Sequence, residues 1–134
     1  MAQSDTNGVT HLRLPPKAEY LPVLRAATSA IAGAMSFDFD EIVQLRFAVS
    51  KLFGMATKRR SLSDDLDLRF IAGPDRLEIQ VTQPSDRLHG SLATEGQERR
   101  AMLKSLMDSV KLGAEKPVVL FVKYKSGERS VRGS

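Results

Sequence analysis

The sequence predicts an α+β fold, a two-layer sandwich in which helices cover one face of a mixed, mostly antiparallel sheet. Three long segments carry apolar residues at helical spacing, and four short segments have the alternating or continuous apolar pattern of strands. Their order along the chain is β, α, α, β, β, α, β. The turn sequence Gly73-Pro74-Asp75-Arg76 between two of the strands is a strong hairpin signal, which supports antiparallel pairing.

The first strand and the first helix are predicted near the N-terminus. Residues Val9 to Leu14 alternate imperfectly between apolar and polar, and Pro15-Pro16 ends them. An alanine-rich amphipathic helix is expected from Glu19 to Ala34. It tolerates Pro22 because a proline in the first turn removes no intrahelical hydrogen bond.

A second helix follows a short connection, in which Asp38 or Asp40 could serve as the N-cap. Its inner face is a wide apolar stripe. The stripe consists of Ile42, Leu45, Ala48, Val49, Leu52, Phe53 and Ala56. The hairpin strands are expected at Leu66 to Ala72 and Leu77 to Thr82.

The C-terminal half is predicted to add a third helix and a last strand. The stretch from Gln83 to Gly96 is polar and irregular, and the helix runs from Gln97 to Val110. Its inner face is expected to consist of Ala101, Leu103, Leu106, Met107 and Val110. The segment Pro117 to Tyr124 has the continuous apolar run of a buried strand. Residues 1–8 and 127–134 are polar, so we expect flexible tails around one domain at 9–126.

Composition excludes several classes of protein. A chain of 134 residues is the size of one domain and can bury a hydrophobic core. Cysteine is absent from it, which excludes disulfide scaffolds, thiolate zinc sites and cysteine nucleophiles. No apolar run approaches the roughly 20 residues that a membrane span needs. The polar N-terminus does not resemble a signal peptide, so a cytoplasmic location without membrane attachment is expected.

The net charge of +4 is mild, and the basic residues are spread along the chain. The densest run is Lys58-Arg59-Arg60, which we interpret as a solvated helix end in preference to a nucleic-acid patch. Such a charge fits an acidic protein partner as well as a nucleic acid. His11 and His89 stand far apart in sequence without a carboxylate cluster, so no metal site is predicted.

Several segments resemble RsbW-like anti-sigma factors, the serine-kinase branch of the GHKL (Bergerat-fold) ATPases. Leu12-Arg13-Leu14-Pro15 and Glu19 to Arg25 resemble the opening strand and first helix of that family. Asp40-Glu41-Ile42 and Leu45 to Ser50 resemble the start of its second helix, and Ser105 to Val110 the end of its third. The resemblance covers most of residues 9–125 and implies the Bergerat fold, which is the two-layer arrangement derived above.

The residues for nucleotide chemistry depart from the family pattern on the second helix. The family carries a Glu-x-x-x-Asn box there, with the glutamate as general base and the asparagine helping to hold Mg²⁺. The aligned positions here are Lys51 and Met55. A lysine at neutral pH is a cation and cannot accept a proton, and Mg²⁺ prefers hard oxygen ligands to a thioether. The resemblance therefore assigns no catalytic residue, although Lys51 occupies the position of the base.

The two remaining nucleotide motifs are also altered. In place of the family's Asp-x-Gly-x-Gly, the chain has Asp86 without the glycines that allow close backbone approach to a ligand. The phosphate-covering Gly-x-Gly falls on Gln97-Glu98-Arg99, where Glu98 repels phosphate and Arg99 attracts it. The family's cofactors are ATP and Mg²⁺. These changes favour a chain that binds neither, because phosphoryl transfer depends on the metal and on positioning.

One functional position of the family is retained. Arg25 lies on the first helix, at the separation from Lys51 that the family's partner-contacting arginine has from its catalytic glutamate. The resemblance implies that this arginine contacts a sigma factor or the competing STAS-domain antagonist. The alternative is an exposed helix arginine that makes only surface ion pairs, which contribute little.

Three functional hypotheses remain at this point. The first is an RsbW-like protein that binds a sigma factor or a STAS-domain anti-sigma antagonist without nucleotide chemistry, with homodimer formation as in the family. The second is an ATP-dependent serine kinase that phosphorylates such an antagonist, with Asp86 or another carboxylate in place of the lost base. The third, which we rank last, is nucleic-acid binding through Lys58-Arg59-Arg60.

Overall fold

The computed structural model describes residues 8–57, 65–82, 97–112 and 118–125. Of the predicted tails at 1–8 and 127–134, all but Gly8 lies outside them, as do Lys58-Arg59-Arg60, His89 and the irregular stretch 83–96. Gly8 begins the first strand. In the part of the chain that the structure describes, no helix has both the length and the apolar character needed to cross a membrane.

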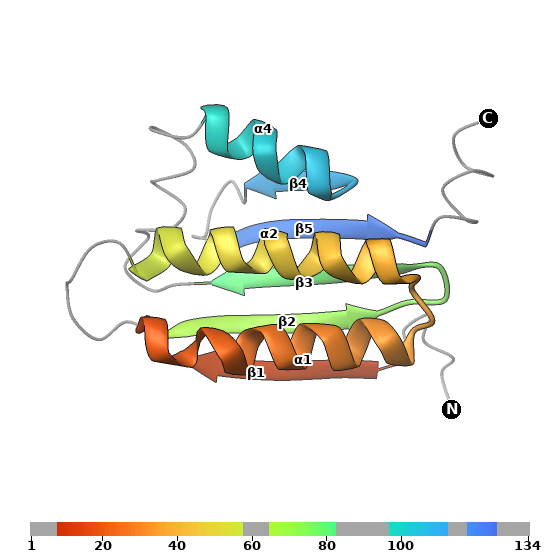
Figure 1. The fold of residues 1–134 in the computed structure, drawn as a ribbon, viewed down its shortest axis with the longest axis horizontal. Coiled ribbons are helices and arrows are strands. Elements are labelled where there is room, and N and C mark those ends of the chain that lie inside the picture. Colours follow the sequence, from red (N-terminus) through yellow and green to blue (C-terminus); the bar gives the residue numbers. More distant parts are fainter. Residues whose placement is uncertain (1–7, 58–64, 83–96, 113–117, 126–134) are drawn as a thin grey trace.

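A five-stranded sheet forms one layer of the molecule (Figure 1). The strands are β1 (Gly8–Leu14), β2 (Leu66–Ala72), β3 (Arg76–Thr82), β4 (Ser109–Leu112) and β5 (Val118–Tyr124). They lie in the spatial order β1-β2-β3-β5-β4, and each neighbouring pair is antiparallel. The predicted α+β sandwich is therefore confirmed, and every pairing that the structure describes in this sheet is antiparallel.

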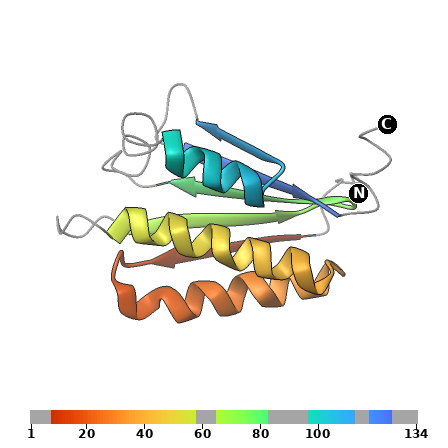
Figure 2. The same cartoon turned by 45° about the horizontal axis from the view of Figure 1, so that its top comes forward.

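Within the described residues, three helices form the second layer: α1 (Leu21–Ala34), α2 (Phe39–Thr57) and α4 (Gln97–Leu106). Figures 1 and 2 show all three on the same face of the sheet, with α1 over the β1 end, α4 over the β4 end and α2 between them. A single 3₁₀ turn, η1 (Ala18–Tyr20), precedes α1. Pro22 lies in the first turn of α1, as predicted.

The hydrophobic core lies between these two layers. Alternate residues of β2 and β3 point into it, and residues of α2 spaced by three and four face them. The largest fully buried side chains are those of Leu24, Leu45, Leu52, Phe53, Leu66, Leu68, Phe70, Leu77, Ile79 and Leu103. The predicted inner stripe of α2 is confirmed from Leu45 to Phe53, with Ile42 partly buried; the side chain of Ala56 lies outside the described part.

Local hydrogen bonds set the turn between α1 and α2. The Phe37 amide donates to the Ala32 carbonyl (3.1 Å) and the Ser36 amide to the Gly33 carbonyl (3.0 Å), the pattern of a Schellman C-cap. Ser36 accordingly adopts a φ of 67°, in the left-handed region. At the start of α2, the Glu41 amide donates to Asp38 Oδ1 (2.8 Å) and the Asp38 amide to Glu41 Oε1 (2.9 Å), a reciprocal capping pair. Of the two predicted candidates, Asp38 is the cap.

The predicted third helix is too long. In the structure α4 ends at Leu106, and the residues that soon follow form β4, a strand that the sequence pattern did not reveal. Val110 pairs with Phe121 of β5, and the Asp108 amide donates to the Val122 carbonyl (2.8 Å). Pairing with a buried neighbouring strand gives this short segment backbone partners that a helix end lacks. Ala101, predicted to face inward, is exposed; Leu103 and Met107 are buried.

A buried lysine joins the end of α4 to α2. Lys123 of β5 is almost fully buried, and its ammonium donates to the Leu106 carbonyl (2.8 Å) and to Gln44 Oε1 (2.5 Å). The last carbonyls of a helix carry partial negative charge, so a cation is favourable there. These bonds help hold α2, α4 and β5 in one arrangement.

The capping pair gives a prediction about stability. Asp38→Ala removes the side-chain acceptor for the Glu41 amide, so the free energy of unfolding should fall by about 0.5–2 kcal/mol. Asp40→Ala is the matched control, because Asp40 is an exposed acid in the same turn whose side chain is not the cap. Urea denaturation of both variants measures the difference; equal losses would contradict the assignment of Asp38.

Candidate functional site

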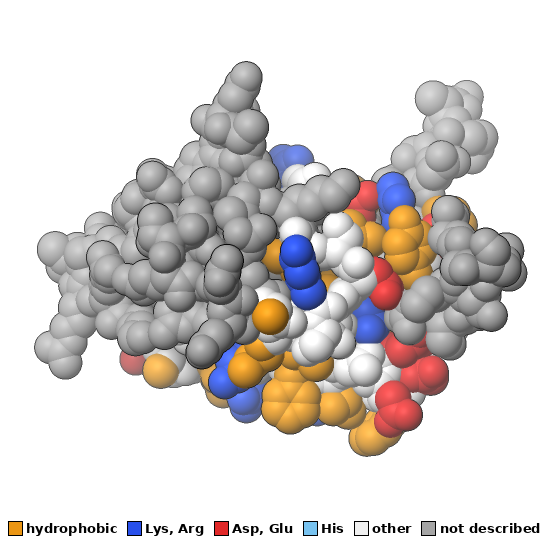
Figure 3. Space-filling model, turned by 90° about the horizontal axis from the view of Figure 1, so that it is seen from above, with side chains coloured by type: hydrophobic (Ala, Val, Ile, Leu, Met, Phe, Trp, Pro, Cys, Tyr) orange, Lys and Arg blue, Asp and Glu red, His pale blue; other side chains and the backbone are white. Residues whose placement is uncertain are grey.

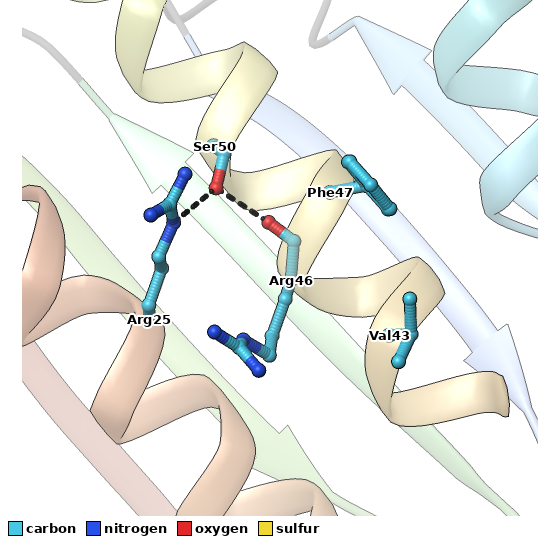
Figure 4. Close-up of a pocket in the computed structure, with 5 residues that line it drawn as sticks. All are labelled: Arg25, Val43, Arg46, Phe47 and Ser50. Atoms are coloured by element: carbon cyan, nitrogen blue, oxygen red, sulfur yellow. Dashed lines mark hydrogen bonds between the residues drawn. The ribbon is translucent and has the colours of Figure 1, made fainter. Parts of the chain in front are cut away.

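The outer surface of α1 and α2 brings together residues that are far apart in the sequence. Arg25, in the second turn of α1, extends toward α2, and its Nε–H donates to the Ser50 hydroxyl oxygen (2.9 Å) (Figure 4). The Ser50 hydroxyl in turn donates to the Arg46 carbonyl one turn earlier in α2 (2.7 Å). The guanidinium of Arg25 is therefore held in a defined place by a group on a different helix.

A shallow pocket of about 270 Å³ lies at this point. Its lining residues are Arg25, Val43, Arg46, Phe47 and Ser50. A second depression of about 380 Å³ adjoins the first, and both are lined by Arg25 and Arg46. In Figure 4 the two arginines lie on the side of α2 that faces α1, while Val43 and Phe47 lie on its other side.

The pocket carries positive charge. Arg25 and Arg46 are both exposed, and within the described ranges neither guanidinium forms an ion pair with a carboxylate. The lining residues of both depressions include no acidic side chain. The Arg25–Ser50 bond also leaves most of the donor groups of Arg25 available, because a guanidinium has five N–H groups.

Phe47 gives the pocket an apolar side. Its side chain is 58% exposed although it lies in the middle of the longest helix. Single exposed apolar residues are ordinary, but an aromatic ring and two arginines, which make no ion pair among the described residues, are residue types enriched at protein–protein interfaces. Figure 3 shows hydrophobic side chains gathered with Lys and Arg along the lower edge of that view, the side on which the helices lie.

The structure describes two of the six site residues that the sequence predicted. Arg25 is one, and Lys51, exposed on α2 directly after Ser50, is the other. Asp86 lies outside the described residues, and the side chains of Met55, Gln97 and Arg99 are likewise outside the described part, although their backbones belong to α2 and α4.

The structure does describe the side chain of Phe53, two positions before Met55. Phe53, predicted as part of the inner stripe of the second helix, is buried in the hydrophobic core. Among the residues that the structure describes, no group of three or more metal-ligating side chains is found.

Sequence reasoning missed four residues of the site: Val43, Arg46, Phe47 and Ser50. Phe47 lies outside the inner stripe, and it follows Val43 at a spacing of four residues, which puts both on one face of the helix. An apolar pair outside the buried stripe is a signal that the sequence contains. The approach of Ser50 to Arg25 could not be found that way, since it depends on how two helices pack.

Other charged contacts lie on the strands and the β2–β3 turn. His11 of β1 pairs with Asp67 of β2, and Arg13 pairs with Asp65 (3.3 Å). At the turn, a hydrogen bond to the Tyr124 hydroxyl, aided by the nearby Glu78 carboxylate, raises the pKa of Arg76 further above its usual range. This arginine keeps its charge at any physiological pH, so it stabilises the turn without acting as a switch.

Comparison with known proteins gives relatives along most of the chain, although no protein-family model matches it. The chain is 27% identical to the serine-protein kinase RsbW of Bacillus subtilis over an alignment of 138 positions, gaps included. The alignment covers 88% of the chain and 86% of that relative. It is 33% identical to RsbW of Bacillus licheniformis over 78 residues, 56% of the chain and 49% of the relative.

The fold is also found among solved structures. A crystal structure of the RsbU and RsbW domains of a Mycobacterium tuberculosis protein matches with a TM-score of 0.62 and 14% identity. The match covers 87% of this chain and 32% of that longer one, so the chain spans about a third of its length. At this level of identity the likeness supports the fold, whereas the relationship in sequence comes from the Bacillus proteins.

The hydrogen bond between Arg25 and Ser50 gives a second prediction. Ser50→Ala removes the acceptor, so the Arg25 Nε–H should exchange faster with solvent in NMR spectra. The free energy of unfolding should change by no more than about 1 kcal/mol, because the pair is exposed. Ser29→Ala, a neighbouring α1 serine that lines the second depression, should leave that exchange unchanged. If the Arg25 Nε–H exchanged at the same rate in the parent chain, Ser50→Ala and Ser29→Ala, the bond would not restrain Arg25.

Proposed function

We propose that this chain, a relative of the RsbW serine-protein kinases in sequence and in fold, is an anti-sigma-factor-like regulatory protein. It binds a sigma factor or a STAS-domain anti-sigma antagonist through the outer surface of α1 and α2. The observation that carries this proposal is Arg25, at the position of the family's partner-contacting arginine, held against α2 by Ser50 and beside the exposed Phe47.

The residue types at two positions of α2 favour protein binding without nucleotide chemistry. Lys51 stands at the position of the family's general base, and its exposed side chain offers no carboxylate oxygen that could take up a proton. Met55, at the metal-binding position, offers a soft sulfur where Mg²⁺ needs oxygen.

A serine kinase is the second candidate. The relatives that share most of the chain are named serine-protein kinases, and the helices and sheet of the matching RsbW domain are retained here. A kinase acting on a STAS-domain antagonist would need another carboxylate as base, for which Asp86 is the candidate of the sequence. Measurements of nucleotide binding separate the two proposals.

The proposed function predicts that Arg25→Glu abolishes partner binding. Truncating a central interface arginine typically costs about 2 kcal/mol or more, or roughly thirtyfold in affinity, and charge reversal adds repulsion. The test is calorimetry of the purified chain against each sigma factor and each STAS-domain protein of its source organism, followed by titration of the binder with the variant.

Arg69→Glu is the matched control. Arg69 is exposed on β2 at a position that alternates with the buried Leu68 and Phe70, so it points away from the helices. This variant should bind within about twofold of the parent chain, and circular dichroism should show that both variants are folded. Unchanged affinity of Arg25→Glu would refute the proposed binding face.

Nucleotide binding gives a further prediction. Saturating ATP and Mg²⁺ should leave the melting temperature nearly unchanged. A ligand at 100 times its Kd would stabilise the fold by about 2.7 kcal/mol, which is several degrees for a domain of this size. A shift of that size would favour the kinase. The melting temperature of Asp86→Asn would then be measured to find whether the substitution removes the shift.

A further inference from the structure

The outer face of α2 carries an apolar row that the core does not use. Phe39, Val43 and Phe47 follow one another at intervals of four residues, so they lie along one side of the helix. Phe39 is 79% exposed and Phe47 is 58% exposed, and both are among the few large hydrophobic side chains that the described chain leaves in solvent. We call these three residues the α2 ridge.

The charges beside the α2 ridge are asymmetric along the helix. Arg25 and Arg46 border it near Phe47, and Lys51 follows Phe47 after one more interval of four residues. At the other end, Asp40 is exposed next to Phe39. The basic half and the apolar row together extend from residue 39 to residue 51, which is about 18 Å at 1.5 Å per residue.

The backbone of this surface restricts what can bind. Both α1 and α2 satisfy their amide and carbonyl groups within each helix along this stretch, so no free strand edge is available for an added β-strand. A partner has to be recognised through side chains alone. A helix that places apolar residues every three or four positions matches a ridge of the same periodicity, as in helix-in-groove recognition.

We infer that the α2 ridge, with Arg25, Arg46 and Lys51, is a docking surface for an acidic amphipathic helix of the partner protein. The partner's apolar side chains pack on Phe39, Val43 and Phe47. Its carboxylates pair with the arginines, which form no ion pair within the described chain. The acidic end of the partner helix lies over Arg46 and Lys51, because Asp40 repels it from the other end. This inference rests on the proposed function and adds the kind of segment that binds.

Variants of the ridge test the inference with the binder from the panel of sigma factors and STAS-domain proteins. Phe47→Ser and Arg46→Glu should each weaken binding about tenfold or more, since aromatic and arginine side chains dominate interfaces. Val9→Ser is the matched control, because Val9 of β1 is 57% exposed and lies on a different element. It should bind as the parent chain does. Melting temperatures near that of the parent would show that the variants are folded.

A photo-cross-linking residue at position 47 identifies the occupant. Mass spectrometry of the cross-linked partner should find a segment that is helical and carries at least two acidic residues. A basic segment, or one that forms a strand, would overturn the inference even if binding is strong.

The outcomes separate this inference from the proposed function. If Arg25→Glu loses binding while Phe47→Ser and Arg46→Glu keep it, the proposed function stands and the ridge is not the docking surface. If the ridge variants lose binding together with Arg25→Glu, both are supported. If no member of the panel binds, the proposed function fails and the inference fails with it.

Discussion

The rest of the structure depends on the packing of α2 against the sheet. Leu45, Val49 and Leu52 are buried on its inner side, in one core cluster with Leu68 of β2 and Ile79 of β3. Burying side chains of this size contributes about 1.5–3 kcal/mol each, so this contact fixes which side of α2 faces inward. Once the inner side is fixed, helical geometry leaves Val43, Arg46 and Phe47 on the outside.

The position of α1 follows from the same constraint. The Schellman turn at Ser36 and the capping pair of Asp38 and Glu41 end one helix and begin the next within a few residues. The short connection keeps the two helices neighbours, and their packing on the sheet lays them side by side, with Arg25 across from Ser50. The site is therefore a consequence of two helix caps and one buried stripe, and its side chains add little to the stability of the fold.

The core of α2 and the positions that the resemblance assigns to nucleotide chemistry involve different residues. The buried residues of α2 that hold it on the sheet differ from those at the family's base and metal positions, Lys51 and Met55. Substitution at an exposed position such as Lys51 leaves the core intact, because surface changes away from caps and buried networks usually alter stability by less than about 0.5 kcal/mol. The two layers and the outer face of the helices therefore do not depend on which residue stands at position 51.

The sequence by itself determined the class of the fold, the inner face of α2 and the location of the β2–β3 hairpin. These depend on local periodicity and turn chemistry, which a single chain displays directly. Through a resemblance, the sequence also indicated Arg25 as a candidate partner-binding residue.

Only the tertiary structure decided where the third helix ends, since Val110 is drawn into a strand by pairing with Phe121, a residue beyond the reach of any local pattern. It likewise decided that Asp38 is the cap, because capping depends on the direction of one side chain. Finally, it decided that Arg25, Arg46 and Phe47 share one surface. The distance between residues on different helices is set by packing across the whole core, and no spacing in the sequence records it.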